Sequence, residues 1–336
     1  MYFITNRLAV RKGTVNEMST KFYACYNRNE EIRMKSSSGG IYSLIAEKII
    51  QEKGVIFAAC YDENLEVVHR KIVSLEGLEE SRGSKYVSSK LGDTFLDIKK
   101  EIEIGNKVLF VGTPCQCEGL LSFLQGKTNN LLCIDFVCHG VPGRNAWRAY
   151  LDSLRRMKIE PQKINMRDKS TGWSRYRYSW RIKDKNGKEV YQLQNENTFM
   201  KGFVRDLYLR PSCLKCQFKG VVRKTDITMG DYWGCWNTQP SMDDDKGTSL
   251  ILIHTDKGMK IFESIKDDIV CESATEENAV KYNPSIIKSS LRCSEGERKY
   301  FVKCIHKGMD FIVLTEQLTD ASIIGKIRRK CIKLFY

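Results

Sequence analysis

Four cysteines stand at positions where their thiolates could share one metal centre. Cys115 and Cys138 each follow an apolar run that predicts a β-strand, and Cys213 and Cys216 form a C-x-x-C pair just after Pro211. Loops that follow parallel strands gather at one edge of a sheet, and the C-x-x-C spacing lets two thiolates bind one centre. Four thiolates are the number that a 4Fe-4S cluster requires. The pattern therefore indicates a metal site.

Two other interpretations fit these cysteines. Zinc also accepts four thiolates, or three with His139, although structural zinc sites usually combine two short-spaced pairs and only one is present. Free cysteine is also a common core residue, and Cys117 and Cys235, beside candidate site loops, are assigned to neither group. We assign the core role to the remaining cysteines, which are Cys25, Cys60, Cys133, Cys271, Cys293, Cys304 and Cys331.

A run of serines and glycines at residues 36–40 precedes an amphipathic helical pattern. The free N–H groups and the positive end of the helix dipole bind anions at such a helix start. Ser37 and Ser38 offer hydroxyl donors, and Gly39 and Gly40 let the backbone approach a ligand closely. Serine is also a good helix cap, and plain capping is the stronger explanation of the local sequence alone.

Three further segments could contact a cofactor. In residues 226–234, Trp233 could stack on a planar ring, and Asp226 or Asp231 could hold a hydrogen-bond donor or a ribose. A short strand with a core aromatic explains the segment equally well. Residues 85–92 offer a cation and hydroxyls that suit phosphate or flavin oxygens, and the alternative there is a solvated turn. The same two interpretations apply to residues 167–173.

The elements that must position these residues alternate between strands and helices. Apolar runs predict strands at 22–26, 55–61, 65–73, 108–111, 131–137 and 249–254. Helical periodicity predicts helices at 41–49, 95–104, 118–124, 145–157, 198–207 and 258–266. Asn186-Gly187 predicts a hairpin turn after the alternating residues 176–182. The fold class is therefore mixed α/β (α+β), with two sheet-containing regions flanked by helices and a helical C-terminal tail.

Composition fits a globular chain. Its 336 residues are 42% hydrophobic and 29% charged, which excludes a disordered or collagen-like protein. Lysine and arginine number 55 against 41 aspartate and glutamate, so the net charge of +14 favours anionic partners. The odd count of 13 cysteines, with no signal-peptide pattern and no apolar run of roughly 18 residues, predicts a cytoplasmic protein with reduced thiols.

The candidate segments occur in a fixed order. They are Ser36-Ser37-Ser38-Gly39-Gly40-Ile41, Lys85-Tyr86 through Leu91-Gly92-Asp93, Gly112-Thr113-Pro114-Cys115-Gln116, Asp135-Phe136-Val137-Cys138-His139-Gly140-Val141-Pro142, Cys213-x-x-Cys216 and Asp226-Ile227-Thr228-Met229-Gly230-Asp231-Tyr232-Trp233-Gly234. This series strongly resembles the beta-subunit family of coenzyme F-420 (deazaflavin) hydrogenases and dehydrogenases, in the bacterial branch found with surface-polysaccharide biosynthesis. Members of the family are flavin and iron–sulfur proteins that pass electrons between an iron–sulfur chain and a two-electron acceptor through FAD.

The resemblance implies an FAD/4Fe-4S oxidoreductase, with the cluster on the four cysteines named first. Lys85 would stabilise the negative charge of the reduced flavin, and His139 would relay protons or hydrogen-bond a cluster sulfur. The residues implied for FAD binding are Ser37, Ser38, Gly39, Gly40, Lys85, Ser88, Ser89, Gly92, Thr113, Asp231 and Trp233.

The resemblance also suggests four regions. Residues 1–20 form an N-terminal extension, 21–105 a flavin-binding region, 106–277 a C-terminal-type domain with the iron–sulfur cysteines and the flavin or substrate site, and 278–336 a helical basic tail.

One departure from the family bears on the partners. Relatives often begin with a ferredoxin-like C-x-x-C-x-x-C-x-x-x-C-P segment, whereas no cysteine precedes Cys25 here. We therefore expect electrons to come from a separate ferredoxin-like protein or from reduced nicotinamide. A homo-oligomer fits these features, and no nucleic-acid partner is expected. The alternative function is that of a metal-stabilised partner-binding protein in a polysaccharide biosynthesis complex, without turnover.

The C-terminal tail has an amphipathic pattern. Apolar side chains fall on one predicted helical face, namely Ile323, Ile324, Ile327, Cys331, Ile332 and Phe335, and the cations around it are Lys326, Arg328, Arg329, Lys330 and Lys333. An apolar face flanked by cations suits an anionic interface, so contact with an acidic partner or peripheral contact with the inner face of the membrane is one interpretation. The alternative, which is the commoner arrangement, is a terminal helix that docks this face on the body of the protein.

Overall fold

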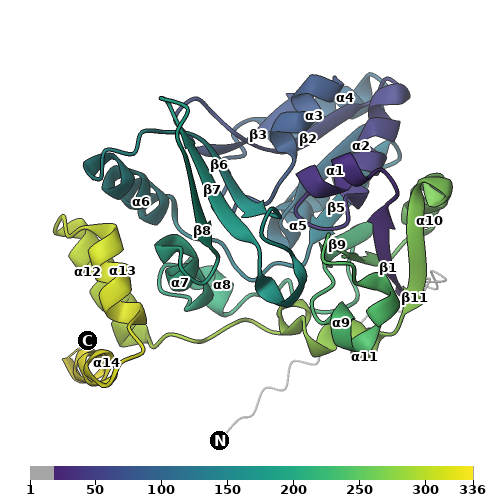
Figure 1. The fold of residues 1–336 in the computed structure, drawn as a ribbon. Coiled ribbons are helices and arrows are strands. Elements are labelled where there is room, and N and C mark those ends of the chain that lie inside the picture. The colour runs from purple at the N-terminus through teal and green to yellow at the C-terminus, as the bar shows by residue number, and fades with distance from the viewer. Residues whose placement is uncertain (1–18, 336) are drawn as a thin grey trace, which may run out of the picture.

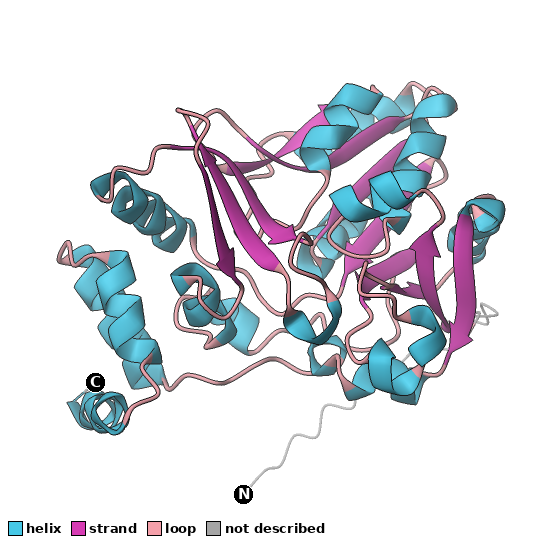
Figure 2. Ribbon diagram, viewed as in Figure 1, coloured by secondary structure: helices cyan, strands magenta, loops and turns pink. Residues whose placement is uncertain are grey.

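The described part of the chain, residues 19–335 of a computed structural model, is built around two β-sheets (Figures 1 and 2). Eight strands form the larger sheet and three form the smaller one, and helices pack against both. This arrangement confirms the predicted mixed α/β class with two sheet-containing regions. The predicted extension at residues 1–20 lies almost entirely outside the described residues.

The larger sheet combines parallel and antiparallel strands. Its order is β11 (Ile269–Ala274), β1 (Lys21–Asn27), β10 (Ser249–Ile253), β9 (Ile227–Asp231), β5 (Leu131–Phe136), β4 (Val108–Gly112), β2 (Val55–Tyr61) and β3 (Val67–Ile72). The neighbours β2, β4, β5 and β9 run parallel, and the remaining pairs are antiparallel. The loops that follow β4 and β5 therefore lie at the same edge of the sheet. Both predicted regions, 21–105 and 106–277, contribute strands to this sheet.

Helices cover both faces of the larger sheet. On one face pack α2 (Ile41–Gln51), α3 (Leu75–Ser81) and α10 (Asp256–Glu263), and on the other α4 (Thr94–Glu103) and α5 (Pro114–Leu124). Strand β4 shows the alternation that permits this, because Leu109 faces the first layer while Val108 and Phe110 face the second. The apolar runs that predict these strands are thus buried on both sides.

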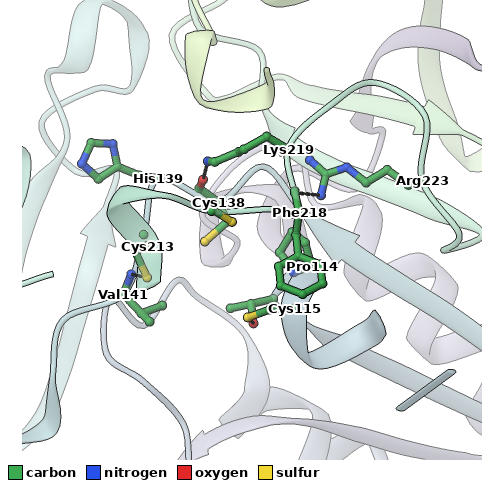
Figure 3. Close-up of a pocket in the computed structure, with 12 residues that line it drawn as sticks. Pro114, Cys115, Cys138, His139, Val141, Cys213, Phe218, Lys219 and Arg223 are labelled. Carbon is green, nitrogen blue, oxygen red and sulfur yellow. Dashed lines mark hydrogen bonds between the residues drawn. The ribbon is translucent and has the colours of Figure 1, made fainter. Parts of the chain in front are cut away.

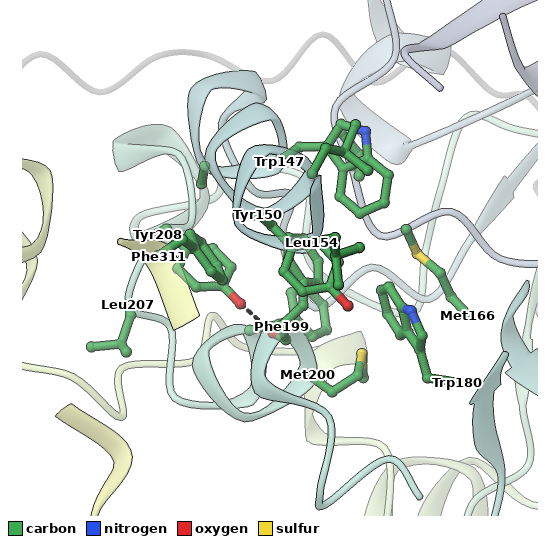
Figure 4. Packing of buried hydrophobic residues seen from close by; sticks show 14 of the residues in the cluster. Trp147, Tyr150, Leu154, Met166, Trp180, Phe199, Met200, Leu207, Tyr208 and Phe311 are labelled. Carbon is green, nitrogen blue, oxygen red and sulfur yellow. Dashed lines mark hydrogen bonds between the residues drawn. The ribbon is translucent and has the colours of Figure 1, made fainter. Parts of the chain in front are cut away.

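The smaller sheet is antiparallel and consists of β6 (Pro161–Asp168), β7 (Ser179–Asp184) and β8 (Glu189–Leu193). The turn between β7 and β8 contains Gly187 at a φ of +80°, which confirms the hairpin predicted from Asn186-Gly187. Its apolar face packs against α6 (Arg144–Arg156), α7 (Thr198–Val204) and α13 (Phe311–Thr319), and together they form an aromatic core (Figure 4).

The C-terminal tail is helical, as predicted. The helices α12 (Glu295–His306), α13 and α14 (Ile323–Phe335) form a group at the edge of the molecule, beyond the smaller sheet (Figure 1). The prediction of a single apolar face on α14 is wrong in one respect, because Ile332 is buried whereas Ile323, Ile324, Ile327 and Cys331 are exposed. None of the described helices is long and apolar enough to cross a bilayer.

Several short elements were not predicted. They include α1 (Glu30–Lys35), α3, β6 and β11, and the remaining short helices are α8 (Pro211–Leu214), α9 (Cys235–Thr238) and α11 (Glu276–Lys281). Strands β6 and β11 carry charged residues that interrupt a strand pattern, and pairing with β7 and β1 determines their conformation. Helix α5 begins at Pro114 rather than residue 118, because Thr113 and Gln116 form a capping box there.

Candidate metal and cofactor site

The four predicted cysteines line one cavity at the carboxyl edge of β4 and β5. Cys115 lies in the first turn of α5, Cys138 follows β5, Cys213 lies in α8, and Cys216 follows that helix. In Figure 3 the sulfur atoms of Cys115, Cys138 and Cys213 surround a common space. The cavity contains about 380 Å³ free of protein atoms, part of which is open to solvent. The fold thus brings together four thiols from three separate segments of the chain.

Two thiols of this cavity are held in their neutral form by burial. Burial raises the pKa of Cys138 to about 12, Cys213 and Cys115 add to the shift, and Lys219 opposes it. Burial also raises the pKa of Cys213, although the Val141 N–H, 3.5 Å from its Sγ, opposes the shift. A metal cation reverses this balance because it binds and stabilises the thiolate.

The kinds of residue around the cavity fit a thiolate-ligated centre. The described lining contains four cysteines and two cations, Lys219 and Arg223, but no carboxylate. Soft thiolate ligands select zinc, copper(I) or iron–sulfur clusters over hard ions such as magnesium. The donor set is therefore suitable for the cluster that the sequence predicts, and also for zinc.

Two cations next to the cysteines were not predicted from the sequence. Lys219 donates from Nζ to the carbonyls of Cys138 and Ser285, the latter at 2.8 Å, and burial lowers its pKa. Arg223 donates from Nη1 to Asp135 Oδ2 at 3.2 Å and to the Phe218 carbonyl at 2.9 Å. Both cations follow the C-x-x-C pair within seven residues, which is the one sequence feature that could have identified them.

His139 lines the cavity and is held by a buried carboxylate. Its Nε2 lies 2.7 Å from Oδ1 of Asp206, and Asp206 also accepts from Ser290 Oγ at 2.8 Å and Arg292 N at 2.7 Å. Burial favours a higher pKa for Asp206, but these hydrogen bonds outweigh it and lower the pKa overall. Asp206 was not predicted because 67 residues separate it from His139.

The serine–glycine run is fixed against the larger sheet. Ser37 Oγ accepts from Ser84 N at 2.6 Å, and Ser38 Oγ donates to the Thr248 carbonyl at 2.9 Å. A Cβ on Gly39 would lie 2.3 Å from the Cys25 carbonyl oxygen, and Gly40, at the N-terminus of α2, has a φ of +83°. Close packing and a left-handed conformation thus account for both glycines, and anion binding by the run stays a prediction.

The Lys85 ammonium also contacts backbone oxygens. Its Nζ donates to the carbonyls of Ser81, Arg82 and Gly83 at 3.1–3.2 Å, at the end of α3. Burial lowers the pKa of Lys85 to about 8. The ammonium group of Lys85 thus has a structural role at this loop. A contact with a flavin, which stays a prediction, would have to replace some of these hydrogen bonds.

A chain of hydrogen bonds joins the predicted flavin residues to the cysteine cavity. Ser89, in the same segment as Ser88 and Gly92, accepts from Gln116 Nε2 at 2.9 Å. Gln116 Oε1 accepts from Thr113 Oγ1 at 3.0 Å, and that hydroxyl lies 3.1 Å from Cys115 Sγ. Of the residues predicted for FAD, Thr113 also lines the cavity itself.

Asp231 and Trp233 lie together around Arg167. The guanidinium of Arg167 donates to both Asp231 oxygens, at 2.7 and 3.0 Å, and to the Ser37 carbonyl at 3.1 Å. Its carbon lies 4.9 Å from the Trp233 ring centroid, and Trp233 stacks on Trp173 at 4.8 Å. Arg167 is 2% exposed, so a solvated turn is the wrong interpretation for residues 167–173.

The remaining cysteines divide by burial. Cys25, Cys60, Cys133 and Cys304 are buried as predicted, and the unassigned Cys117 and Cys235 are buried too. The prediction of burial is wrong for Cys271 and Cys293, which are partly exposed, and for Cys331, which is exposed on α14. Strand β11, which carries Cys271, lies at the edge of the larger sheet and is less completely covered.

Comparison with solved structures shows the class of fold. The chain resembles a chain of the F420-reducing NiFe hydrogenase complex from Methanosarcina barkeri, with a TM-score of 0.53 and 14% sequence identity over 86% of this chain and 93% of that chain. At this identity the similarity concerns the fold alone: the chain has a fold of the type found in that hydrogenase complex.

The family follows from the sequence itself. Residues 105–279, just over half of the chain, match the family that comprises the C terminus of the coenzyme F420 hydrogenase/dehydrogenase beta subunit. The chain belongs to this family, and it is a redox protein of the beta-subunit kind. Among curated proteins no sequence matches it. The resemblance predicted from the ordered motifs is thus confirmed, and the bacterial polysaccharide branch stays a prediction.

Proposed function

We propose that the chain is an oxidoreductase that uses FAD and a 4Fe-4S cluster to pass electrons between the cluster and a two-electron donor or acceptor. The observation that supports this most directly is the cavity lined by Cys115, Cys138, Cys213 and Cys216. Family membership supplies the redox class, and the four thiols supply the ligand type and number that a cubane needs.

The family, rather than the spacing of the thiols, favours a cluster over a single ion. One zinc ion at 2.3 Å from each sulfur requires sulfurs about 3.8 Å apart in a tetrahedron. Among the described residues, no group of three or more histidine, cysteine, aspartate or glutamate side chains is arranged to hold a metal ion. The four thiols that line the cavity would ligate the proposed cluster, and Lys219 and Arg223 would offset the negative charge of its thiolates.

The residues that would hold FAD are the eleven that the family resemblance implies. When bound, FAD exchanges electron pairs with hydride donors and single electrons with metal clusters. Ser37, Asp231 and Trp233 meet around Arg167, and Ser89 connects through Gln116 and Thr113 to Cys115. These contacts bring two parts of the implied set together, and a flavin held by Ser89 and Thr113 would adjoin the cysteine cavity.

His139 would take up or release a proton at this site. Asp206 accepts from Nε2 of His139, which leaves Nδ1 to take up or release a proton. The carboxylate fixes the tautomer and the ring orientation, as partners of catalytic or ligating histidines commonly do. Asp206 is therefore a positioning residue in this proposal.

Electron partners are part of the proposal. The similar fold occurs in a hydrogenase complex, which supports a separate protein, of ferredoxin type, as the electron donor or acceptor. Reduced nicotinamide is the small-molecule alternative, because FAD accepts a hydride from it.

The test is the visible spectrum of anaerobically purified full-length protein, combined with iron, sulfide, zinc and flavin analysis. We expect flavin bands over a broad iron–sulfur shoulder, with about four irons per chain. A colourless protein that contains zinc would overturn the proposal and support the metal-stabilised partner-binding function. Flavin without iron would overturn the cluster assignment alone.

A further inference from the structure

The last helix, α14, carries a row of exposed apolar side chains that faces away from the rest of the protein. Ile323, Ile327 and Leu334 recur at intervals of four and seven residues, so they lie on one face of the helix. These side chains are 74%, 56% and 80% exposed, and Ile324 beside them is 69% exposed. We call Ile323, Ile327 and Leu334 the outer stripe. Isolated exposed leucines need no explanation, but apolar side chains gathered on one face of a helix are a candidate interaction surface.

The opposite face of α14 is already docked on the protein. Ile332 on that face is 6% exposed and belongs to the aromatic core cluster. Arg329 donates from Nη1 to the carbonyls of Leu318, at 3.4 Å, and Asp320, and a Cβ on Gly325 would lie 2.4 Å from the Asp320 carbonyl oxygen. Rotation of α14 to bury the outer stripe would break these contacts. The outer stripe is therefore not the face that attaches α14 to the body.

A row of lysines follows the outer stripe. Lys326, Lys330 and Lys333 recur at intervals of four and three residues, and all three are exposed. Residues 321–336 contain five lysines and arginines and no aspartate or glutamate. The aliphatic stems of lysines can lie along apolar surface while the ammonium groups reach toward anions.

We propose that α14 docks on an anionic lipid surface, with the outer stripe at the acyl boundary and the lysine row at the phosphates. A helix with aliphatic side chains on one face and cations beside them binds in the plane of such an interface. Helix α14 lies at the edge of the molecule (Figure 1), and the side chains of the outer stripe are exposed there. This inference does not depend on the proposed electron transfer.

A second copy of the chain fits the same surface less well. An isologous contact would place the same patch on both partners, so two rows of lysines would face each other across the interface. Like charges at an interface disfavour association, whereas the phosphates of an anionic bilayer complement the lysine row.

The test is co-sedimentation of the full chain with vesicles of phosphatidylcholine, alone or mixed with phosphatidylglycerol, at low and high salt. We expect binding to the mixed vesicles at low salt and release at high salt, because salt screens exposed charges. Each basic side chain contributes about fivefold to such partitioning. The triple variant K326Q/K330Q/K333Q should therefore bind on the order of 100-fold more weakly, and I323S/I327S/L334S should lose at least about tenfold.

Matched variants elsewhere on the surface serve as controls. K183Q/K185Q/K188Q removes the same charge from exposed positions around the β7–β8 hairpin, and V73S/L75S/I104S removes side chains that are 60%, 53% and 72% exposed. Both controls should bind as the unmodified chain does. The proposal is wrong if all four variants bind equally, or if the unmodified chain ignores anionic vesicles at low salt. Dimerisation in sedimentation equilibrium that I323S/I327S/L334S abolishes, without vesicle binding, would assign the surface to a second copy instead.

Discussion

The aromatic core beside the smaller sheet and the cysteine cavity at the edge of the larger sheet differ in how completely they are filled. Phe199 is fully buried, and its ring lies 5.1 Å from that of Tyr150 and 5.3 Å from those of Trp147 and Tyr208 (Figure 4). In the cavity, Cys115 is exposed and Cys213 is half-buried. Close packing in the core therefore stabilises the fold, whereas the cavity leaves the cysteine side chains accessible to a ligand.

A buried ion pair joins the two sheets. Arg167 extends from β6 of the smaller sheet, and Asp231 ends β9 of the larger sheet. Their bidentate contact joins the smaller sheet, which the aromatic core stabilises, to the larger sheet, which carries the cysteines. The comparison leads us to expect large losses of stability from the core and the ion pair, and small ones from the cysteines.

The largest expected effect is in the core. Phe199→Ala should lower the free energy of unfolding by about 3–5 kcal/mol, because it removes a ring from a closely packed cluster. Urea denaturation of the metal-free protein measures this loss. The control Phe123→Ala, at a ring that is 40% exposed on α5, should cost about 0.5 kcal/mol. Similar costs for both variants would show that the aromatic cluster does not dominate stability.

The ion pair should come next. Asp231→Ala leaves the Arg167 charge buried and should cost about 3 kcal/mol. The double variant Asp231→Ala/Arg167→Met should recover part of that loss, because it removes the uncompensated charge. Removal of the exposed Arg155–Asp152 pair should change stability by at most about 0.5 kcal/mol. If Asp231→Ala and Asp152→Ala have equal effects, the two sheets are not joined by this contact.

Acid should remove one contribution to stability in the larger sheet, that of the neutral His254 beside Thr228. Burial lowers the pKa of His254 to about 4, and its Nε2 lies 2.9 Å from Thr228 Oγ1, which also contacts Asp135 on β5. In the unfolded chain this imidazole takes up a proton near pH 6.5. The unfolded state therefore binds more protons between pH 6.5 and 4, and the stability that the neutral His254 provides is lost as the pH falls through that range.

This linkage predicts the effect of a substitution at His254. His254→Gln keeps a hydrogen-bonding side chain but cannot protonate, so its stability should fall by about 2 kcal/mol less than that of the unmodified chain between pH 6.5 and 4. Chemical denaturation across this pH range measures the difference. Parallel pH curves for the two proteins would exclude His254 as a source of acid sensitivity.

The cysteines should show the smallest effect on the metal-free protein. Cys213→Ser and Cys216→Ser should each change its free energy of unfolding by less than about 1 kcal/mol. In the anaerobically loaded protein they should remove most of the bound iron and the stability that comes with it, because ligand binding is linked to folding in such sites. Cys60→Ser and Cys271→Ser should leave the iron per folded chain unchanged. Equal iron loss in all four variants, or none in any, would contradict the assignment.

What the sequence predicts well is local. Helix α2 and strands β2, β4 and β5 follow from apolar patterns within a few residues, and the meeting of Cys115 with Cys138 follows from the rule for parallel strands. The partners that complete the site depend on tertiary structure. Asp206 reaches His139 from 67 residues away, and Arg167 carries no local sign that it is buried. Strand β11 forms because β1 lies beside it, not because of its own pattern.

The place of β1 in the larger sheet has a consequence for synthesis. This strand leaves the ribosome early, yet its neighbours β10 and β11 begin about 220 and 240 residues later. At roughly 5–20 residues per second, β1 waits on the order of 10–50 seconds for a partner. During that interval its backbone N–H and C=O groups are open to other chains. Newly made protein is thus most prone to mispairing before residue 253 emerges.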